Sequence, residues 1–405
     1  MKETPVQRPG RAAAPVVPDF ALWQLGFRPL YLAAAIFALF DIAVWALQFG
    51  GSVQHPVLAG PMWHAHEMIF GYALAVIAGF LLTAVRNWTG RPTPTGAPLM
   101  GIVAIWLLAR VLAFTPWPLA TALANAGFAI AVAIGIGVPI VRAHNRRNYF
   151  FIGLFGLFAL LAVLAQATLQ GLVRIEPLPA LRLALDLVLF IMVVMAGRVV
   201  PMFTNNGIPG LAARRHPLVE KVSLGAVIAL FLADLPALAD LPAAGLLAGL
   251  IALIAALAHG VRLALWQPLR TFSRATALVW VLHVAYAWIV VHLLLRAGAA
   301  FGLGTHSLAV HALTAGAIGM LTLGMMTRTA RGHTGRPLRA DEFEIAMFVL
   351  VGLSAALRVF GPLFEPVRLV GYVQLSALFW VAAFGLYVVR YWPVLTRPRL
   401  DGKPG

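Results

Sequence analysis

Hydrophobic residues occur along this chain in runs of about twenty that recur from Pro29 almost to the last residue. A helix needs about 20 apolar residues to cross a hydrocarbon layer of roughly 30 Å. The runs therefore predict an all-α membrane protein of about twelve transmembrane helices. The predicted spans cover residues 29–49, 63–85, 97–115, 118–141, 149–173, 178–200, 218–236, 241–265, 274–296, 305–327, 342–362 and 367–391.

The composition agrees with a membrane environment and narrows the chemistry. Of the 405 residues, 61% are hydrophobic and 11% are charged, whereas about 25% of residues are charged in soluble domains. The chain contains no cysteine, which excludes disulfides, iron–sulfur clusters and thiolate ligands. Any metal would have to be held by histidine, methionine, carboxylate or backbone oxygen.

Basic residues concentrate in every second loop between the predicted spans. The few on the other side are Arg110, Arg174, Arg182, Arg296, Arg358 and Arg368. Because loops rich in Lys and Arg stay in the cytoplasm, both termini are expected there. The net charge of +16 then indicates topology and contact with anionic membrane lipid, and no nucleic-acid partner. We expect a flexible cytoplasmic tail at residues 1–26, one transmembrane domain at 27–393 and a second cytoplasmic tail at 394–405.

An internal repeat relates the second and tenth predicted helices. Residues 64–92 align without a gap to residues 309–337. The alignment pairs His66 with His311, Gly71 with Gly316, Gly79 with Gly324, Arg86 with Arg331, and TGRP at 89–92 with TGRP at 334–337. A weaker match after the sixth helix, NNGIP at 205–209, suggests that helices two, six and ten are equivalent. This predicts three units of four helices related by an axis along the membrane normal.

Histidines dominate the ionisable residues that the topology places within the membrane. Five of them would lie in one layer near the external face, brought there by helices two, nine and ten: His64, His66, His292, His306 and His311. Neutral imidazole is the commonest axial ligand of haem iron and also suits copper. His66 and His311, paired by the repeat, are the natural bis-histidine candidates, with His64 or His306 as alternatives. A histidine at this depth can equally sit at the headgroup level in contact with water.

Further candidates complete the list of polar residues within the spans. His306, His292, His283 and His259 are candidate metal ligands, the last two lying deeper in helices nine and eight. Asp41 and Glu67 are candidates for carrying protons or for a hydrogen bond to a ligating imidazole. Asp186 follows Arg182 by four residues, a spacing at which the two charges can neutralise each other on one helix.

Four stretches of the sequence resemble the NnrS family of bacteria. They are GFRPLYL at 26–32, WHAHEMIFGYALAVIAGFLLTAVRNWTG at 63–90, GRVVPMFTNNG at 197–207 and HALTAGAIGMLTLGMMTRTARGHTGRPL at 311–338. The resemblance implies a twelve-helix protein of the bacterial inner membrane that contains haem, expected to be of the b type, and copper. It also implies a link to denitrification and to resistance against nitric oxide. His64, His66, Glu67 and His311 lie within the matching stretches.

Nitric oxide is small and uncharged and enters lipid freely, so a haem within the membrane would meet it directly. We therefore expect a haem-dependent nitric oxide reductase that takes electrons from quinol or a periplasmic carrier, with Glu67 as a proton relay. A factor that only binds haem or copper is one alternative. A secondary transporter is another, although transporters place their polar groups near the midplane of the membrane and here the polar layer lies near one face.

Overall fold

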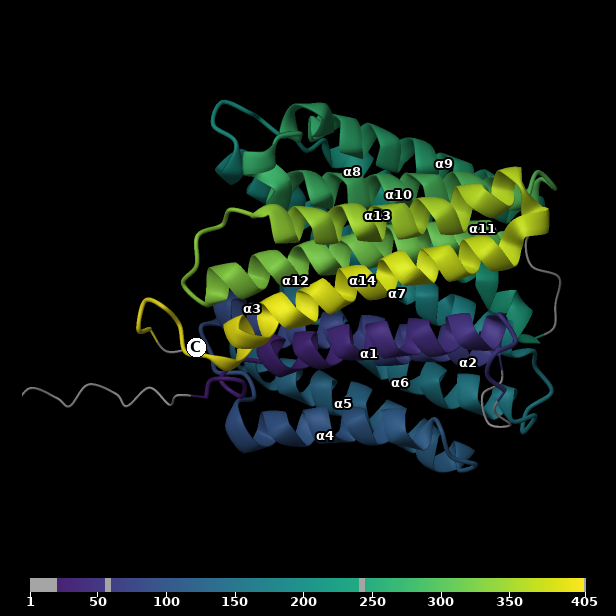
Figure 1. Ribbon diagram of the computed structural model, residues 1–405, viewed down its shortest axis with the longest axis horizontal. Coiled ribbons are helices and arrows are strands. Elements are labelled where there is room, and N and C mark those ends of the chain that lie inside the picture. The colour runs from purple at the N-terminus through teal and green to yellow at the C-terminus, as the bar shows by residue number, and fades with distance from the viewer. Residues whose placement is uncertain (1–19, 55–59, 240–244, 404–405) are drawn as a thin grey trace, which may run out of the picture.

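The computed structural model describes residues 20–54, 60–239 and 245–403, and the helices run side by side along its longest axis (Figure 1). Within these ranges the chain forms twelve helical rods and no β-strand. The rods are α1 (Phe27–Phe49), α2–η1–α3 (Pro61–His66, Glu67–Ala73, Leu74–Thr89), α4 (Gly96–Leu112), α5 (Pro118–Arg142), α6 (Phe150–Leu169), α7 (Pro177–Gly207), α8 (Pro217–Asp234), α9 (Gly245–Leu265), α10 (Ala277–Ala300), α11–η6–α12 (His306–His311, Ala312–Ile318, Gly319–His333), α13 (Glu342–Phe364) and α14 (Leu369–Thr396).

Short 3₁₀ turns lie between or beside some of these rods: η2 (Arg146–Asn148), η3 (Leu235–Ala239), η4 (Pro268–Thr271), η5 (Arg274–Thr276) and η7 (Pro366–Arg368). Among the described residues, ten rods are long and apolar enough to cross a membrane. The other two are α4, which is apolar but has 17 residues, and α8, which carries Glu220, Lys221 and Asp234. The predicted all-α fold with about twelve spans is confirmed.

Three rods form the centre of the bundle. The apolar stretches of α2–η1–α3, α7 and α11–η6–α12 are 89%, 83% and 72% buried, against 61% or less for the other seven membrane-length rods. These are the second, sixth and tenth helices along the chain, the three that the internal repeat predicts to be equivalent. Their hydrophobic residues face protein on all sides, which is what a helix that is apolar all round requires.

The nine outer rods close around this centre with threefold regularity. The last helix of each predicted four-helix unit packs closely against the first helix of the next, as α5 does on α6 and α9 on α10. The ring is completed by α14, which packs against α1. The arrangement therefore has the form of three four-helix units around one axis.

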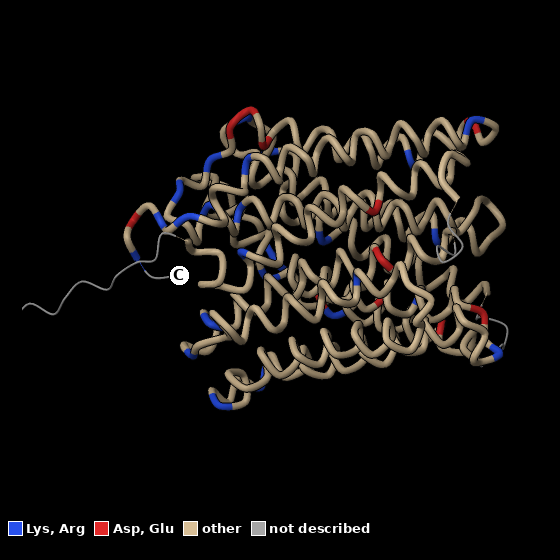
Figure 2. The backbone as a smooth tube through the Cα atoms, turned by 60° about the horizontal axis from the view of Figure 1, so that its bottom comes forward, with Lys and Arg blue, Asp and Glu red and all other residues tan. Residues whose placement is uncertain are grey.

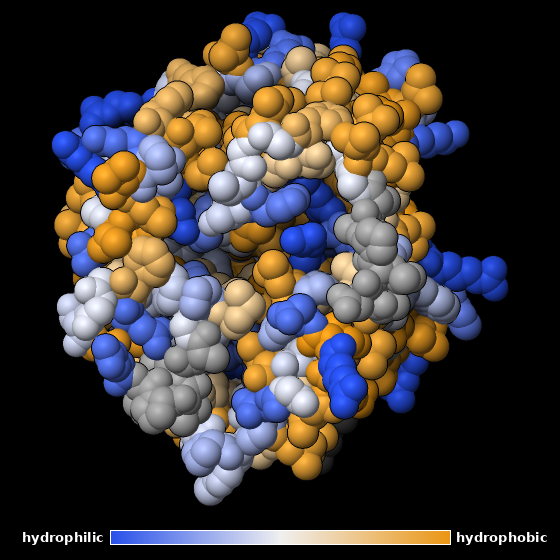
Figure 3. All heavy atoms as spheres, turned by 90° about the vertical axis from the view of Figure 1, so that its right-hand side faces the viewer, coloured by the Kyte–Doolittle hydropathy of each residue, from blue (hydrophilic) through white to orange (hydrophobic). Residues whose placement is uncertain are grey.

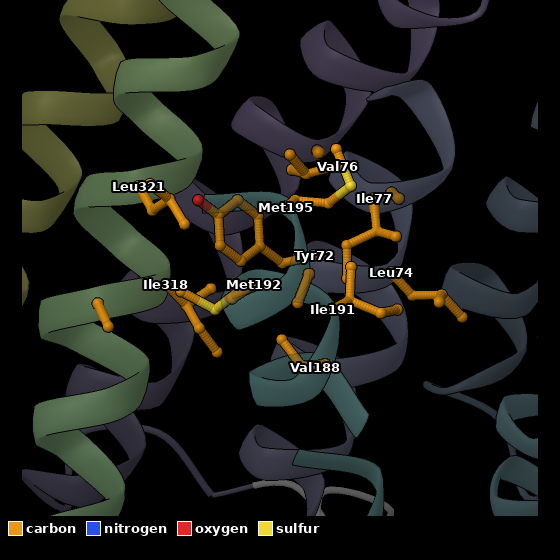
Figure 4. Close-up of a cluster of buried hydrophobic side chains, with 14 of the residues drawn as sticks. Tyr72, Leu74, Val76, Ile77, Val188, Ile191, Met192, Met195, Ile318 and Leu321 are labelled. Carbon is orange, nitrogen blue, oxygen red and sulfur yellow. The ribbon is translucent and has the colours of Figure 1, made fainter. Parts of the chain in front are cut away.

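Apolar side chains fill the middle of the three central rods. Figure 4 shows the side chain of Tyr72 on η1 among aliphatic side chains and methionines from α3, α7, η6 and α12. The Tyr72 hydroxyl and the Thr322 hydroxyl are 2.5 Å apart and join the two repeated rods. The labelled members of this cluster are Tyr72, Leu74, Val76, Ile77, Val188, Ile191, Met192, Met195, Ile318 and Leu321.

The two ends of the bundle differ in charge. Lys and Arg gather at the end where the chain leaves α3, α7, α12 and α14, as Figure 2 shows, and we call this the basic end. The described beginning and end of the chain meet there, because the Ala21 amide donates to the Thr396 carbonyl at 2.7 Å. Of the predicted first tail, residues 1–19 lie outside the described residues, whereas Ala21 and Leu25 are buried against the bundle.

Candidate functional site

The two repeated rods share the same break in helical geometry. In each, six α-helical residues are followed by seven residues of the wider π-helix and then by α-helix again. The π segments begin directly after His66 and after His311, the two histidines that the repeat aligns. π-Helical turns are rare and are frequent at functional sites. The repeat is thus preserved in the backbone, at the depth where the sequence places its histidines.

Glycines within the π segments allow close packing at equivalent points. A Cβ added to Gly71 would lie 2.5 Å from a guanidinium nitrogen of Arg110, and one added to Gly316 would lie 2.4 Å from the ring of Trp288. The Gly71 carbonyl accepts a hydrogen bond of 2.9 Å from the Trp106 indole. The two segments are therefore held by bulky side chains of neighbouring helices.

His64 is oriented by a buried carboxylate on α1. Its Nδ1 lies 3.0 Å from Oδ2 of Asp41, which is fully buried. The ring stacks on Trp45 with centroids 4.9 Å apart and planes 7° apart. No described residue contacts its Nε2 through a hydrogen bond. A ligating histidine usually donates its other ring N–H to a carboxylate or carbonyl, so His64 has the arrangement of a prepared ligand.

His311 has an equivalent arrangement on the other repeated rod. Its Nδ1 lies 2.7 Å from the Ser307 carbonyl oxygen one turn earlier. Its Nε2 likewise has no hydrogen-bond partner among the described residues. His64 and His311 lie in the equivalent six-residue helices α2 and α11, each directly before the π segment of its rod. His64 and His311 thus each have Nδ1 against an oxygen and Nε2 without a hydrogen-bond partner in the described chain, an arrangement that His292 and His259 share.

His66 belongs to a separate, closed network. Its Nδ1 bonds Oε1 of Glu67 at 2.8 Å, and its Nε2 lies 3.3 Å from the Gln166 amide nitrogen. Arg110 donates to Oε2 of Glu67 and to Oδ1 of Asn125. As the HxH spacing predicts, His64 and His66 point to different surroundings: one toward α1 and the other toward α6. Both ring nitrogens of His66 are occupied by protein.

A small cavity adjoins this network. It has a volume of about 40 Å³ and is lined by His66, Glu67, Thr121 and Gln166 among others. A water molecule takes about 30 Å³ in the liquid, so the cavity has room for water and none for a porphyrin. Figure 3 views the end of the bundle opposite the basic end, where hydrophilic side chains are visible in a central hollow.

The remaining candidate histidines are His306, His292, His283 and His259. His306 is exposed at the start of α11. His292 is buried, with Nδ1 2.7 Å from the Ala309 carbonyl oxygen and Nε2 unpartnered in the described chain. His283 contacts the Thr204 hydroxyl at 2.8 Å and His259 the Tyr286 hydroxyl at 2.5 Å. No three His, Asp or Glu side chains among the described residues converge as a metal site.

Several residues of the site were not singled out from the sequence. Arg110, Asn125 and Gln166 complete the network around Glu67, and only the unusual position of Arg110 on the less basic side signals it. The expected neutralisation of Asp186 by Arg182 is not what the structure shows. Asp186 accepts from Arg296 at 2.8 Å, while Arg182 lies 3.9 Å from Asp234. An arginine side chain is long enough to reach a carboxylate on another helix, and this determines which ion pairs form.

A threefold bundle of this length, with a buried layer of histidines, carboxylates and arginines, defines a multi-pass membrane protein. Comparison with known protein families matches residues 21–399 to the family described as NnrS protein. The chain belongs to the NnrS family, which is linked to the response to nitric oxide. No curated protein sequence matches the chain.

Proposed function

We propose that this protein binds haem through His64 and His311 and acts in the detoxification of nitric oxide. The observation that carries the proposal is that each of the two repeated rods has one such imidazole in the six-residue helix before its π segment. Each Nδ1 faces an oxygen, at 3.0 Å from Asp41 and at 2.7 Å from Ser307, and each Nε2 is free of protein partners in the described chain. This donor set fits the axial ligation of haem iron.

The pair differs from the one that the repeat alone favours. Ligation by His66 would require Gln166 to leave its Nε2, whereas His64 and His311 need no such change. The two proposed ligands then come from different positions of the repeat, because position 309, the repeat equivalent of His64, is alanine. We propose that this end faces the outside of the bacterial inner membrane and that the basic end faces the cytoplasm, as the positive-inside rule favours.

Bound haem would supply an iron able to pass electrons to nitric oxide, and nitric oxide would reach that iron only by displacing His64 or His311 from it. Reduction of two nitric oxide molecules to nitrous oxide and water consumes two electrons, from quinol or a periplasmic carrier, and two protons. Asp41 is the better proton carrier, because its Oδ1 is buried without a partner in the described chain while Oδ2 orients His64. Glu67 is fixed between Arg110 and His66 and balances charge. Copper stays a prediction for His306, His292, His283 and His259.

The test is consumption of nitric oxide by the purified full-length protein, reduced with a chemical donor and loaded with haem. We expect consumption by the wild type, its loss in the pair His64→Ala and His311→Ala, and a clear slowing in Asp41→Asn. His216→Ala, an exposed position in the loop before α8, is the control. Haem binding without consumption would indicate a non-catalytic handling factor and would refute the reductase.

A further inference from the structure

A large cavity lies among the three central rods at the basic end, far along the same helices from His64 and His311. Its volume is about 790 Å³. Each central rod lines it with one stripe of residues at spacings of three and four, beginning at Phe80 on α3, Met195 on α7 and Met325 on α12. Thr83, Arg198 and Arg328 occupy the equivalent second place in the three stripes. The cavity therefore lies on the axis that relates the three units.

The lining of this cavity is strongly cationic. Arg147, Arg198, Arg215 and Arg328 contribute to it, and no Asp or Glu of the described residues does. Arg215 lies 3.6 Å from Glu220, which is outside the lining. The other three arginines have no carboxylate partner in the described part of the chain. Arg328 is buried and Arg198 is half-buried, whereas Arg147 and Arg215 are exposed. A charge buried in a membrane protein is normally paired or functional, so Arg328 and Arg198 are the candidates for holding an anion.

Arg328 shows how such an anion would be held. Its side chain is deeply buried, with the residue 8% exposed, and its guanidinium lies over the Phe203 ring at 3.9 Å from the centroid. It makes no hydrogen bond or ion pair to any described residue. Stacking on the ring fixes the plane of the guanidinium and leaves its edge donors free. A planar fork of this kind matches the oxygens of phosphate and carboxylate groups.

Arg198 adds a second oriented guanidinium from α7. Its Nη1 donates to Oδ1 of Asn148 at 2.8 Å, and aromatic rings of Trp88, Phe150 and Phe151 surround it at about 6 Å. One edge of the Arg198 guanidinium is thus held by Asn148, while its other N–H groups are available to donate to an anion. The methionine and aromatic parts of the lining provide an apolar surface beside the two charges.

We propose that this cavity binds a phosphate-class oxyanion carrying an apolar or aromatic group, with Arg328 and Arg198 holding the oxyanion. Pockets for small ligands measure about 300–1,000 Å³ and are mostly apolar with a few convergent polar groups, which describes this cavity. The phosphate has two sources, the headgroup of an anionic lipid or a soluble phosphate ester. Basic pockets between transmembrane helices bind anionic headgroups. The site is independent of the haem ligands.

The experiment is ligand-dependent thermal stabilisation of the full-length protein purified in a neutral detergent. The probes are phosphatidylglycerol, with phosphatidylcholine as the uncharged lipid, and ADP and inorganic phosphate, with chloride at equal ionic strength. We expect saturable stabilisation of the wild type by phosphatidylglycerol if the ligand is a lipid, or by ADP or phosphate if it is soluble. Stabilisation by none of the three beyond its neutral or chloride control would overturn the proposal.

Three variants test whether the ligand binds in this cavity. Arg328→Gln should weaken binding about tenfold, because it removes a charge-assisted pair of hydrogen bonds. Arg274→Gln is the matched control, since it removes the same charge from an exposed ion pair with Glu342, and it should bind as the wild type does. Gly332→Phe, at a lining position where a Cβ meets only Leu338 at 3.5 Å, should block the cavity without removing an arginine. Unchanged binding in both Arg328→Gln and Gly332→Phe would refute the site.

Discussion

The two repeated rods, α2–η1–α3 and α11–η6–α12, have the same backbone and different chemistry. Both change from α- to π-helix directly after the aligned histidine. In the first rod that histidine precedes Glu67, which is buried with Arg110, whereas in the second it precedes Ala312. Glu67 and Gln166 occupy both ring nitrogens of His66, whereas among the described residues only Ser307 bonds the ring of His311, at Nδ1. The difference teaches that the repeat sets the position of the histidines along the rods, while neighbouring side chains decide which imidazole is available.

The buried charge in the first rod gives the largest expected effect on stability. Arg110→Ala would leave the buried Glu67 without its arginine, at a cost of about 3–5 kcal/mol in the free energy of unfolding. Unfolding in mixed micelles with increasing SDS measures this. Arg274→Ala, which breaks an exposed pair, should cost at most about 1 kcal/mol. Equal effects of the two substitutions would show that the network does not hold the first rod.

The glycines of the two π segments should behave alike if the repeat is structural. Gly71→Ala and Gly316→Ala each place a methyl group against a packed side chain, at 2.5 Å from Arg110 and 2.4 Å from Trp288. Each should lower the free energy of unfolding by about 1–3 kcal/mol. Gly101→Ala, where nothing lies within 4 Å of the added Cβ, is the control and should not destabilise. If Gly71→Ala lowers the free energy of unfolding and Gly316→Ala leaves it unchanged, the two π segments are not structurally equivalent.

The hydrogen bond between the rods is expected to have a smaller effect. Tyr72→Phe removes the contact of 2.5 Å with the Thr322 hydroxyl while keeping the ring in the central cluster. The expected loss is about 1 kcal/mol, measured in the same unfolding series. Thr322→Val should lose a similar amount. The total loss in the double variant should be about the same as in either single variant, since both substitutions remove the same interaction. Fully additive losses would mean that the two hydroxyls do not interact.

Much of the fold could be predicted from the sequence because the membrane imposes a length and a composition on every span. The repeat between His66 and His311 likewise predicted which rods are equivalent, whereas their position at the centre of the bundle is seen only in the structure. The π segments could not be predicted, since a wider turn depends on packing against Arg110 and Trp288 rather than on local preference. The choice of His64 over His66 depended on Gln166, 100 residues away in the chain. Ion pairs between arginines and carboxylates on different helices, such as Arg296 with Asp186, also depend on the packing of the helices and could not be predicted from the sequence.

The most direct test of the central claim is the haem content of the purified protein, read from its absorbance spectrum and from the reduced pyridine complex of extracted haem. The wild type should contain haem with the spectrum of two histidine ligands. His64→Ala and His311→Ala should each lose it or change its ligation, while His66→Ala should retain the wild-type spectrum. Absence of haem from the wild type, or loss in His66→Ala with retention in His64→Ala, would contradict the proposed pair.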